Sequence, residues 1–274
     1  MRFGVLESSL PSANGSLDTI RDAAAAGFDG IALQLDGPDP SAHPAWHPGG
    51  RADIRRTAAD AGVAVASVSL GFFWQGWDAG AGLCADDADD RDRAREALSR
   101  AVDAAAALGA DLVTVPFFGV NEITNETRRE RVAEAMRAVA GAAEIAGVTL
   151  TVETSLPVEG NVALLDAVDS PAVALCHDAA NTEALYGRDA AAEIRALGDR
   201  IGEVHVKDFL VPPPDPPANN VHLGEGTVDF EAVAAALSAV GNDGWYVLET
   251  PFDAPIAETE RDLAFTKRLL GADA

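Results

Sequence analysis

Short apolar runs rich in β-branched residues alternate with longer, Ala-rich amphipathic stretches along the whole chain. The runs are typical of strands buried on both faces, and the stretches are typical of the helices that cover such strands. Strands are predicted at 2–7, 30–35, 63–70, 111–117, 148–154, 172–177, 202–208 and 245–250. Helices are predicted near 16–26, 51–61, 91–108, 126–146, 161–168, 189–199, 229–240 and 257–270. Eight strand and helix pairs predict an α/β fold, a single (β/α)8 TIM barrel domain over residues 1–274.

Glycine follows the predicted helix in five of these pairs, a position where a left-handed residue ends the helix and turns the chain into the next strand. The five residues are Gly27, Gly62, Gly109, Gly147 and Gly241. An open, doubly wound sheet is the competing architecture. The first strand is not followed by a GxGxxG turn, and the number of pairs favours a closed barrel.

The chain is strongly acidic, with 44 Asp and Glu against 18 Arg and two Lys, and a formal net charge of −24. This charge repels polyanions and anionic lipid surfaces, so neither nucleic acid nor membrane is predicted as a partner. Acidic runs with few lysines, such as ADDADDRDRARE at 85–96, favour a halophilic protein whose carboxylates stay hydrated in concentrated salt. An ordinary acidic protein is the plainer alternative.

Two cysteines, Cys84 and Cys176, are too few for a disulfide framework, and neither belongs to a CxxC pair. The first residues, MRFGVLESS, lack the features of a signal peptide, and no stretch approaches the roughly 20 apolar residues of a membrane helix. These features predict a cytoplasmic protein with reduced thiols.

Four polar residues lie at or near the downstream ends of the last four predicted strands: Glu153, Asp178, His205 and Glu249. In a (β/α)8 barrel, active sites lie at the C-terminal ends of the strands, so these side chains are expected to converge. Any one such carboxylate more often caps a helix or pairs with Arg. Together, three carboxylates and one imidazole predict a site for one divalent cation, with Mn²⁺ favoured and Mg²⁺ or Co²⁺ as alternatives.

Such a site suits proton transfer next to a carbonyl through an enediolate, because the cation polarises the carbonyl and a carboxylate removes the proton. Glu153 and Glu249 are the predicted acid/base pair of a sugar isomerase or epimerase. A keto-cyclitol dehydratase of the inosose type, using the same site, is the first alternative. A barrel that binds metal and sugar without catalysis is the second.

The second half of the chain resembles the xylose isomerase-like (AP endonuclease family 2) superfamily, in its branch of sugar isomerases and ketose 3-epimerases. The resemblance rests on Glu153, Asp178, HVKD at 205–208, HLGEGTVDF at 222–230 and the YVLE that ends at Glu249. It implies that Glu153 and Glu249 are both metal ligands and acid/base groups, while Asp178 and His205 are ligands only. It also implies that Glu159 binds a small-molecule sugar substrate and that the chain forms homodimers or homotetramers.

Two positions depart from the ketose 3-epimerase pattern. Asn181 stands where those enzymes carry a His, and residues 209–230 contain no substrate-binding Arg. The amide of Asn181 can still hydrogen-bond a hydroxyl group. The DNA-repair branch is disfavoured, because its additional zinc-binding histidines are missing after the third and fourth strands.

Further substrate contacts are predicted outside the four strand-end residues. Lys207 follows His205 by two positions and therefore faces the same side of its strand, where it binds substrate or pairs with a carboxylate. The aromatic loop 71–80 contains Phe72, Phe73, Trp74 and Trp77, which either wall a sugar pocket, Trp74 above all, or pack beneath the loop.

Overall fold

The computed structural model describes residues 1–37, 39–75, 82–211 and 220–272. Eight strands form a closed barrel in the order β1 to β8, which confirms the predicted fold class. They are β1 (Arg2–Leu6), β2 (Gly30–Gln34), β3 (Ala64–Ser69), β4 (Leu112–Phe117), β5 (Thr149–Thr154), β6 (Val173–Asp178), β7 (Ile201–Val206) and β8 (Trp245–Leu248). The pairs β1–β2, β1–β8, β3–β4, β4–β5, β5–β6 and β7–β8 are parallel.

Each predicted helix is present, and a short helix, α3, follows β3. The helices are α1 (Leu17–Ala25), α2 (Pro48–Ala61), α3 (Phe72–Gln75), α4 (Ala88–Leu108), α5 (Glu126–Ala146), α6 (Val158–Val168), α7 (Ala190–Leu197), α8 (Phe230–Val240) and α9 (Ile256–Leu269). Polar side chains cap several N-termini: Asp87 accepts from the backbone N–H of Asp89 and Asp90, and Asp229 accepts from Ala232. The five predicted helix-ending glycines all adopt positive φ.

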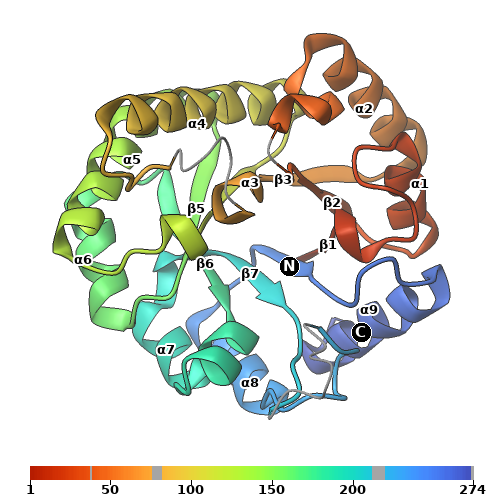
Figure 1. The fold of residues 1–274 in the computed structure, drawn as a ribbon. Coiled ribbons are helices and arrows are strands. Elements are labelled where there is room, and N and C mark those ends of the chain that lie inside the picture. The colour runs from red at the N-terminus through yellow and green to blue at the C-terminus, as the bar shows by residue number, and fades with distance from the viewer. Residues whose placement is uncertain (38, 76–81, 212–219, 273–274) are drawn as a thin grey trace. The chain divides into compact units, whose positions relative to one another are not determined.

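The chain divides into two compact units. The first comprises Met1–Ala32, Thr57–Ala64 and His177–Ala274, and in it α7 and α8 lie side by side (Figure 1). The second comprises Leu33–Arg56 and Val65–Cys176, and in it α5 packs against both α4 and α6 (Figure 1).

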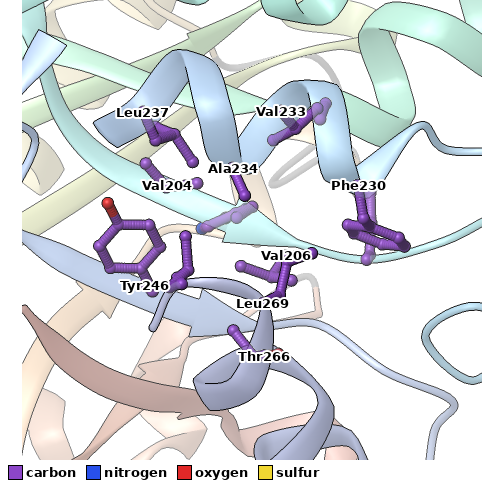
Figure 2. Close-up of a pocket in the computed structure, with 13 residues that line it drawn as sticks. Val204, Val206, Phe230, Val233, Ala234, Leu237, Tyr246, Thr266 and Leu269 are labelled. Carbon is purple, nitrogen blue, oxygen red and sulfur yellow. The ribbon is translucent and has the colours of Figure 1, made fainter. Parts of the chain in front are cut away.

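The alternation of side chains along β7 decides which of its residues can serve a site. Val204 lies beside Leu237 of α8, and Val204, Val206 and Tyr246 line an apolar cavity of about 20 Å³ (Figure 2). Because successive strand residues face opposite sides, the intervening residues of β7 turn towards the barrel interior. Packing of one face against α8 therefore fixes the orientation of the other.

Both cysteines are buried thiols. Within the described residues, every helix is too short or too polar to cross a bilayer.

Candidate active site and metal centre

The carboxyl ends of β6, β7 and β8 bring three of the predicted ligands together. Asp178 ends β6, His205 is the penultimate residue of β7, and Glu249 directly follows β8. One donor atom of each residue lies within 4.8 Å of a donor atom of the other two. Asp178 and His205 are buried, and the side chain of Glu249 is 18% exposed. Three separate strands thus supply two carboxylates and an imidazole to one small volume.

Lys207 lies among these carboxylates. Its Nζ is 2.8 Å from Oδ2 of Asp178 and 3.0 Å from Oε2 of Glu249, and its side chain is only 7% exposed. The β7–β8 register explains the second contact: Val206 pairs with Leu248, so the next residues, Lys207 and Glu249, become neighbours across the strands. An ammonium in this position offsets the repulsion between two buried carboxylates.

The electrostatic surroundings keep Glu249 ionised. Burial by itself raises the pKa of Glu249, but the charge of Lys207 and the hydrogen bond and charge of His205 outweigh burial and lower the pKa to about 2. The carboxylate therefore carries its negative charge throughout the neutral range, as cation binding requires.

Glu203 is a site residue that sequence reasoning missed. It lies two positions before His205 on the same face of β7 and is completely buried. Its Oε1 is 3.6 Å from Nε2 of His205, whereas Nδ1 of His205 is 3.5 Å from Oε2 of Glu249. A carboxylate behind the second ring nitrogen is the usual support of a metal-binding histidine, because it fixes the tautomer and orients the ring. The spacing of Glu203, His205 and Lys207, two residues apart along β7, was the sequence signal that could have indicated Glu203 as a site residue.

A hydrogen bond from the following turn holds Asp178 in place. Its Oδ1 accepts from the backbone N–H of Asn181 at 2.8 Å, at the start of the π-helical turn Asn181–Leu185. Asn181 was predicted to bind substrate through its side chain. In the structure the backbone N–H of Asn181 holds Asp178 in place. The side chain of Asn181 is buried, and its contact with substrate stays a prediction.

Three further predicted residues lie in the second unit. Glu153 is buried near the end of β5, in register with Pro116 of β4. Glu159 is exposed in the first turn of α6, and Trp74 in α3 is 46% exposed. Their catalytic and substrate-binding roles stay predictions.

The aromatic loop divides between core and surface. Phe72 and Phe73 are buried, with ring centroids 4.6 Å apart, and Phe72 meets Trp46 edge-on at 6.1 Å. These two rings therefore pack beneath the loop, while Trp74 is exposed. Trp77 lies outside the described residues.

His222, in the segment between β7 and α8, joins that segment to α9. Its Nδ1 is 2.7 Å from Oδ2 of Asp262 and its Nε2 is 2.8 Å from Oε2 of Glu258. Burial lowers the pKa of His222, but the hydrogen bonds to the two carboxylates outweigh it, and the pKa is raised. The two contacts of His222 thus tie the segment after β7 to the last helix.

The donor set fits a divalent cation. Two carboxylate oxygens and one imidazole nitrogen suit Mn²⁺, Mg²⁺ or Co²⁺ in preference to a thiolate-bound structural zinc ion. The buried ammonium of Lys207 beside two of the three ligands is independent evidence that this pair of carboxylates needs a positive charge.

The fold and the cluster of potential ligands define a class of protein, a (β/α)8 barrel with a candidate cation site at the carboxyl ends of its strands. The chain belongs to the xylose isomerase-like TIM barrel family, whose model matches residues 20–269. This confirms the resemblance drawn from the strand-end motifs.

Curated relatives of the chain are sugar epimerases, which are enzymes of the isomerase class. The 2-epi-5-epi-valiolone 7-phosphate 2-epimerase of Actinoplanes sp. is 31% identical over 230 residues, which cover 83% of this chain and 79% of that protein. The L-ribulose-5-phosphate 3-epimerase of Salmonella paratyphi C is 28% identical over 256 residues, covering 90% of this chain and 86% of that one.

Solved structures agree in fold. The crystal structure of D-psicose 3-epimerase in the presence of D-fructose has a TM-score of 0.78 at 20% identity, covering 99% of this chain and 100% of that one. The 3-keto-D-glucoside 4-epimerase of E. coli has a TM-score of 0.74 at 18% identity, covering 98% and 99% of the two chains.

Proposed function

We propose that this protein is a divalent-metal-dependent sugar epimerase that moves a proton next to a carbonyl through an enediolate. One observation carries the proposal: Asp178, His205 and Glu249 converge from three strands on one point, with Lys207 beside them. Two carboxylates and an imidazole brought this close supply the oxygen and nitrogen donors that a divalent cation such as Mn²⁺ prefers.

The proposal adds Glu153 to the cluster as the fourth ligand. The order of strands in the barrel supports it, because β5 precedes β6, β7 and β8 in the sheet and Glu153 is buried near the end of β5. The family assignment gives the same support. Glu153 and Glu249 then form the acid/base pair, one removing the proton and the other returning it, which is worth roughly 10² to 10⁴ in rate.

A bound divalent cation supplies Lewis-acid polarisation of the substrate carbonyl. The protein's own residues do the rest. Glu249, ionised at neutral pH, accepts the proton from the carbon next to the carbonyl. Glu203 orients His205, and the Asn181 amide orients Asp178. Lys207 holds the two carboxylates at fixed separation.

The relatives set the range of substrates to be tested. Their names include two phosphate esters, a free ketose and a keto-glucoside. We propose a polyhydroxy ketone as the shared chemistry, with Glu159, Asn181 and Trp74 as candidate contacts. We further propose that residues 1–274 act as one barrel domain, in a homodimer or homotetramer, in the cytoplasm.

Elimination of water from a keto-cyclitol is the second candidate function. The buried ammonium of Lys207 favours it, since a proton donor beside the ligands could assist a leaving hydroxyl. The same proton abstraction would begin both reactions, and the mass of the product separates them.

The test is proton exchange in D₂O, followed by NMR, with metal-loaded protein and a panel of ketoses, aldoses and inososes. An epimerase introduces deuterium next to the carbonyl and gives an isomer of the substrate, whereas a dehydratase gives a product lighter by one water. Glu249→Gln and Glu153→Gln should each abolish exchange while binding of Mn²⁺ remains measurable by calorimetry. Full exchange in either variant would refute the acid/base assignment.

A further inference from the structure

We infer that the substrate is an uncharged polyhydroxy ketone and not its phosphate ester. The inference rests on the proposed function and narrows its substrate class. A (β/α)8 barrel commonly binds phosphate with the loops after its seventh and eighth strands and a nearby helix N-terminus. In the described part of the loop after β7, several backbone amides are already bound by the chain's own carboxylates.

Asp208 binds the backbone of the turn after β7. Its Oδ1 accepts from the N–H groups of Phe209 at 3.0 Å and Val228 at 3.2 Å. Its Oδ2 accepts from Gly224 at 3.0 Å and Gly226 at 2.8 Å. Asp208 is fully buried, and a Cβ on Gly226 would lie 2.0 Å from Oδ1. Four amides that could have bound a phosphate oxygen are therefore satisfied by an internal carboxylate.

The N-terminus of α8 is likewise occupied by acidic groups. The side chain of Asp229 accepts from the N–H of Ala232 at 3.0 Å, and the N–H of Asp229 donates to Oε2 of Glu183 at 3.2 Å. Glu231 adds a third carboxylate to the first turn. These carboxylates thus compensate the positive end of the α8 dipole, and they would repel the negative charge of a bound phosphate.

Cationic side chains are nearly missing from the segments that join each strand to the next major helix. These segments are 7–16, 35–47, 70–87, 118–125, 155–157, 179–189, 207–229 and 249–255. They contain one lysine, Lys207, and one arginine, Arg188. Lys207 pairs with Asp178 and Glu249, and Arg188 pairs with Glu193 at 2.6 Å while lying over the ring of Tyr186. Both cations are held by groups of the chain itself.

Two arginines in the first turns of α2 and α5 donate hydrogen bonds to the loops that precede those helices. Arg51 donates to the carbonyl of Ala45 at 3.1 Å, and Arg128 donates to the carbonyl of Glu122 at 2.7 Å. Arg261 in α9 reaches the turn after β7, where its Nη2 lies 3.2 Å from Oε1 of Glu225. The Arg261 side chain is 52% exposed and lies at this turn, so it serves as the test position.

The deciding experiment compares one ketose with its own terminal phosphate ester. The rate of deuterium exchange next to the carbonyl is measured for both with the metal-loaded protein in about 1 M KCl, where long-range repulsion by the net charge is screened. We expect kcat/KM for the ester to be lower by about 100-fold, the size of effect that one unpaired buried charge produces. Preference for the ester by about tenfold or more would overturn the inference while leaving the proposed function intact, and its loss in Arg261→Gln would identify Arg261 as the phosphate ligand.

Calorimetry gives a readout that does not depend on turnover. Inorganic phosphate and the ketose phosphate are titrated into the metal-free wild-type protein and into Arg261→Gln, so that phosphate cannot bind through a metal ion. We expect no saturable binding by either protein up to about 10 mM. Saturable binding at about 1 mM or tighter by the wild-type protein would refute the inference, and its loss in Arg261→Gln would assign the binding to Arg261. Absence of exchange with every ketose, free or esterified, would instead refute the proposed function.

Discussion

Replacement of Lys207 by methionine removes a buried ammonium with little change in side-chain volume. Its Nζ lies 2.8 Å from Asp178 and 3.0 Å from Glu249, so the variant leaves two buried carboxylates without their internal cation. Removing one partner of a buried ion pair costs about 3–5 kcal/mol. We therefore expect Lys207→Met to lose about 3–5 kcal/mol of unfolding free energy in the presence of a chelator.

A divalent cation should reverse most of this loss, because it supplies the missing positive charge to the same carboxylates. We expect Mn²⁺ to bind the variant about tenfold more tightly than the wild type, which corresponds to about 1.4 kcal/mol, since Lys207 no longer repels the cation. Mn²⁺ should also stabilise the variant more strongly than the wild type.

The assay is urea unfolding at fixed pH with chelator and with Mn²⁺, together with calorimetric titration of Mn²⁺. Lys267→Met is the matched control, because Lys267 is the other lysine of the chain. It lies in α9, with its Nζ 5.7 Å from the centroid of the Phe3 ring. An equal loss of stability with and without Mn²⁺, or weaker binding of Mn²⁺ by Lys207→Met, would refute the reasoning.

Three further predictions concern other parts of the molecule. Glu203→Gln should weaken Mn²⁺ binding by about 10- to 100-fold in calorimetry, because His205 loses the carboxylate behind its second nitrogen; unchanged affinity would contradict this role. The pKa of His222 is raised in the folded protein. The ion pairs of His222 therefore stabilise the fold fully below about pH 6.5, the pKa of a histidine in the unfolded chain, and this stabilisation is lost as pH rises through the folded-state pKa. His222→Gln should therefore be most destabilising at low pH in thermal unfolding, and a deficit that grows towards high pH would exclude the ion pairs with Glu258 and Asp262. With a net charge of −24, the unfolding free energy should rise as KCl is raised from about 0.1 to 1 M, and a flat response would argue against adaptation to salt.

The candidate site could be predicted only in part. Asp178, His205 and Glu249 were predictable because parallel strands in a barrel place their carboxyl ends on one face, so position along the strand gives position in the site. Lys207 was identified by strand alternation, but its bridging of two carboxylates depends on the β7–β8 register. Glu203 follows the same alternation but was not predicted as a site residue. Its role depends on its contact with His205, which becomes visible only in the folded structure.

The sequence by itself determined the eight strands and helices, the helix-ending glycines and the family, because these follow from local periodicity, local turn chemistry and short motifs. The tertiary structure decided which side chains contact one another. In the folded chain Phe72 and Phe73 are buried in the core, whereas Trp74 is exposed. Folding of the segment after β7 brought Asp208 onto the amides of Gly224 and Gly226, 16 and 18 residues downstream. Contacts across such distances depend on chain path and packing, which no local pattern encodes.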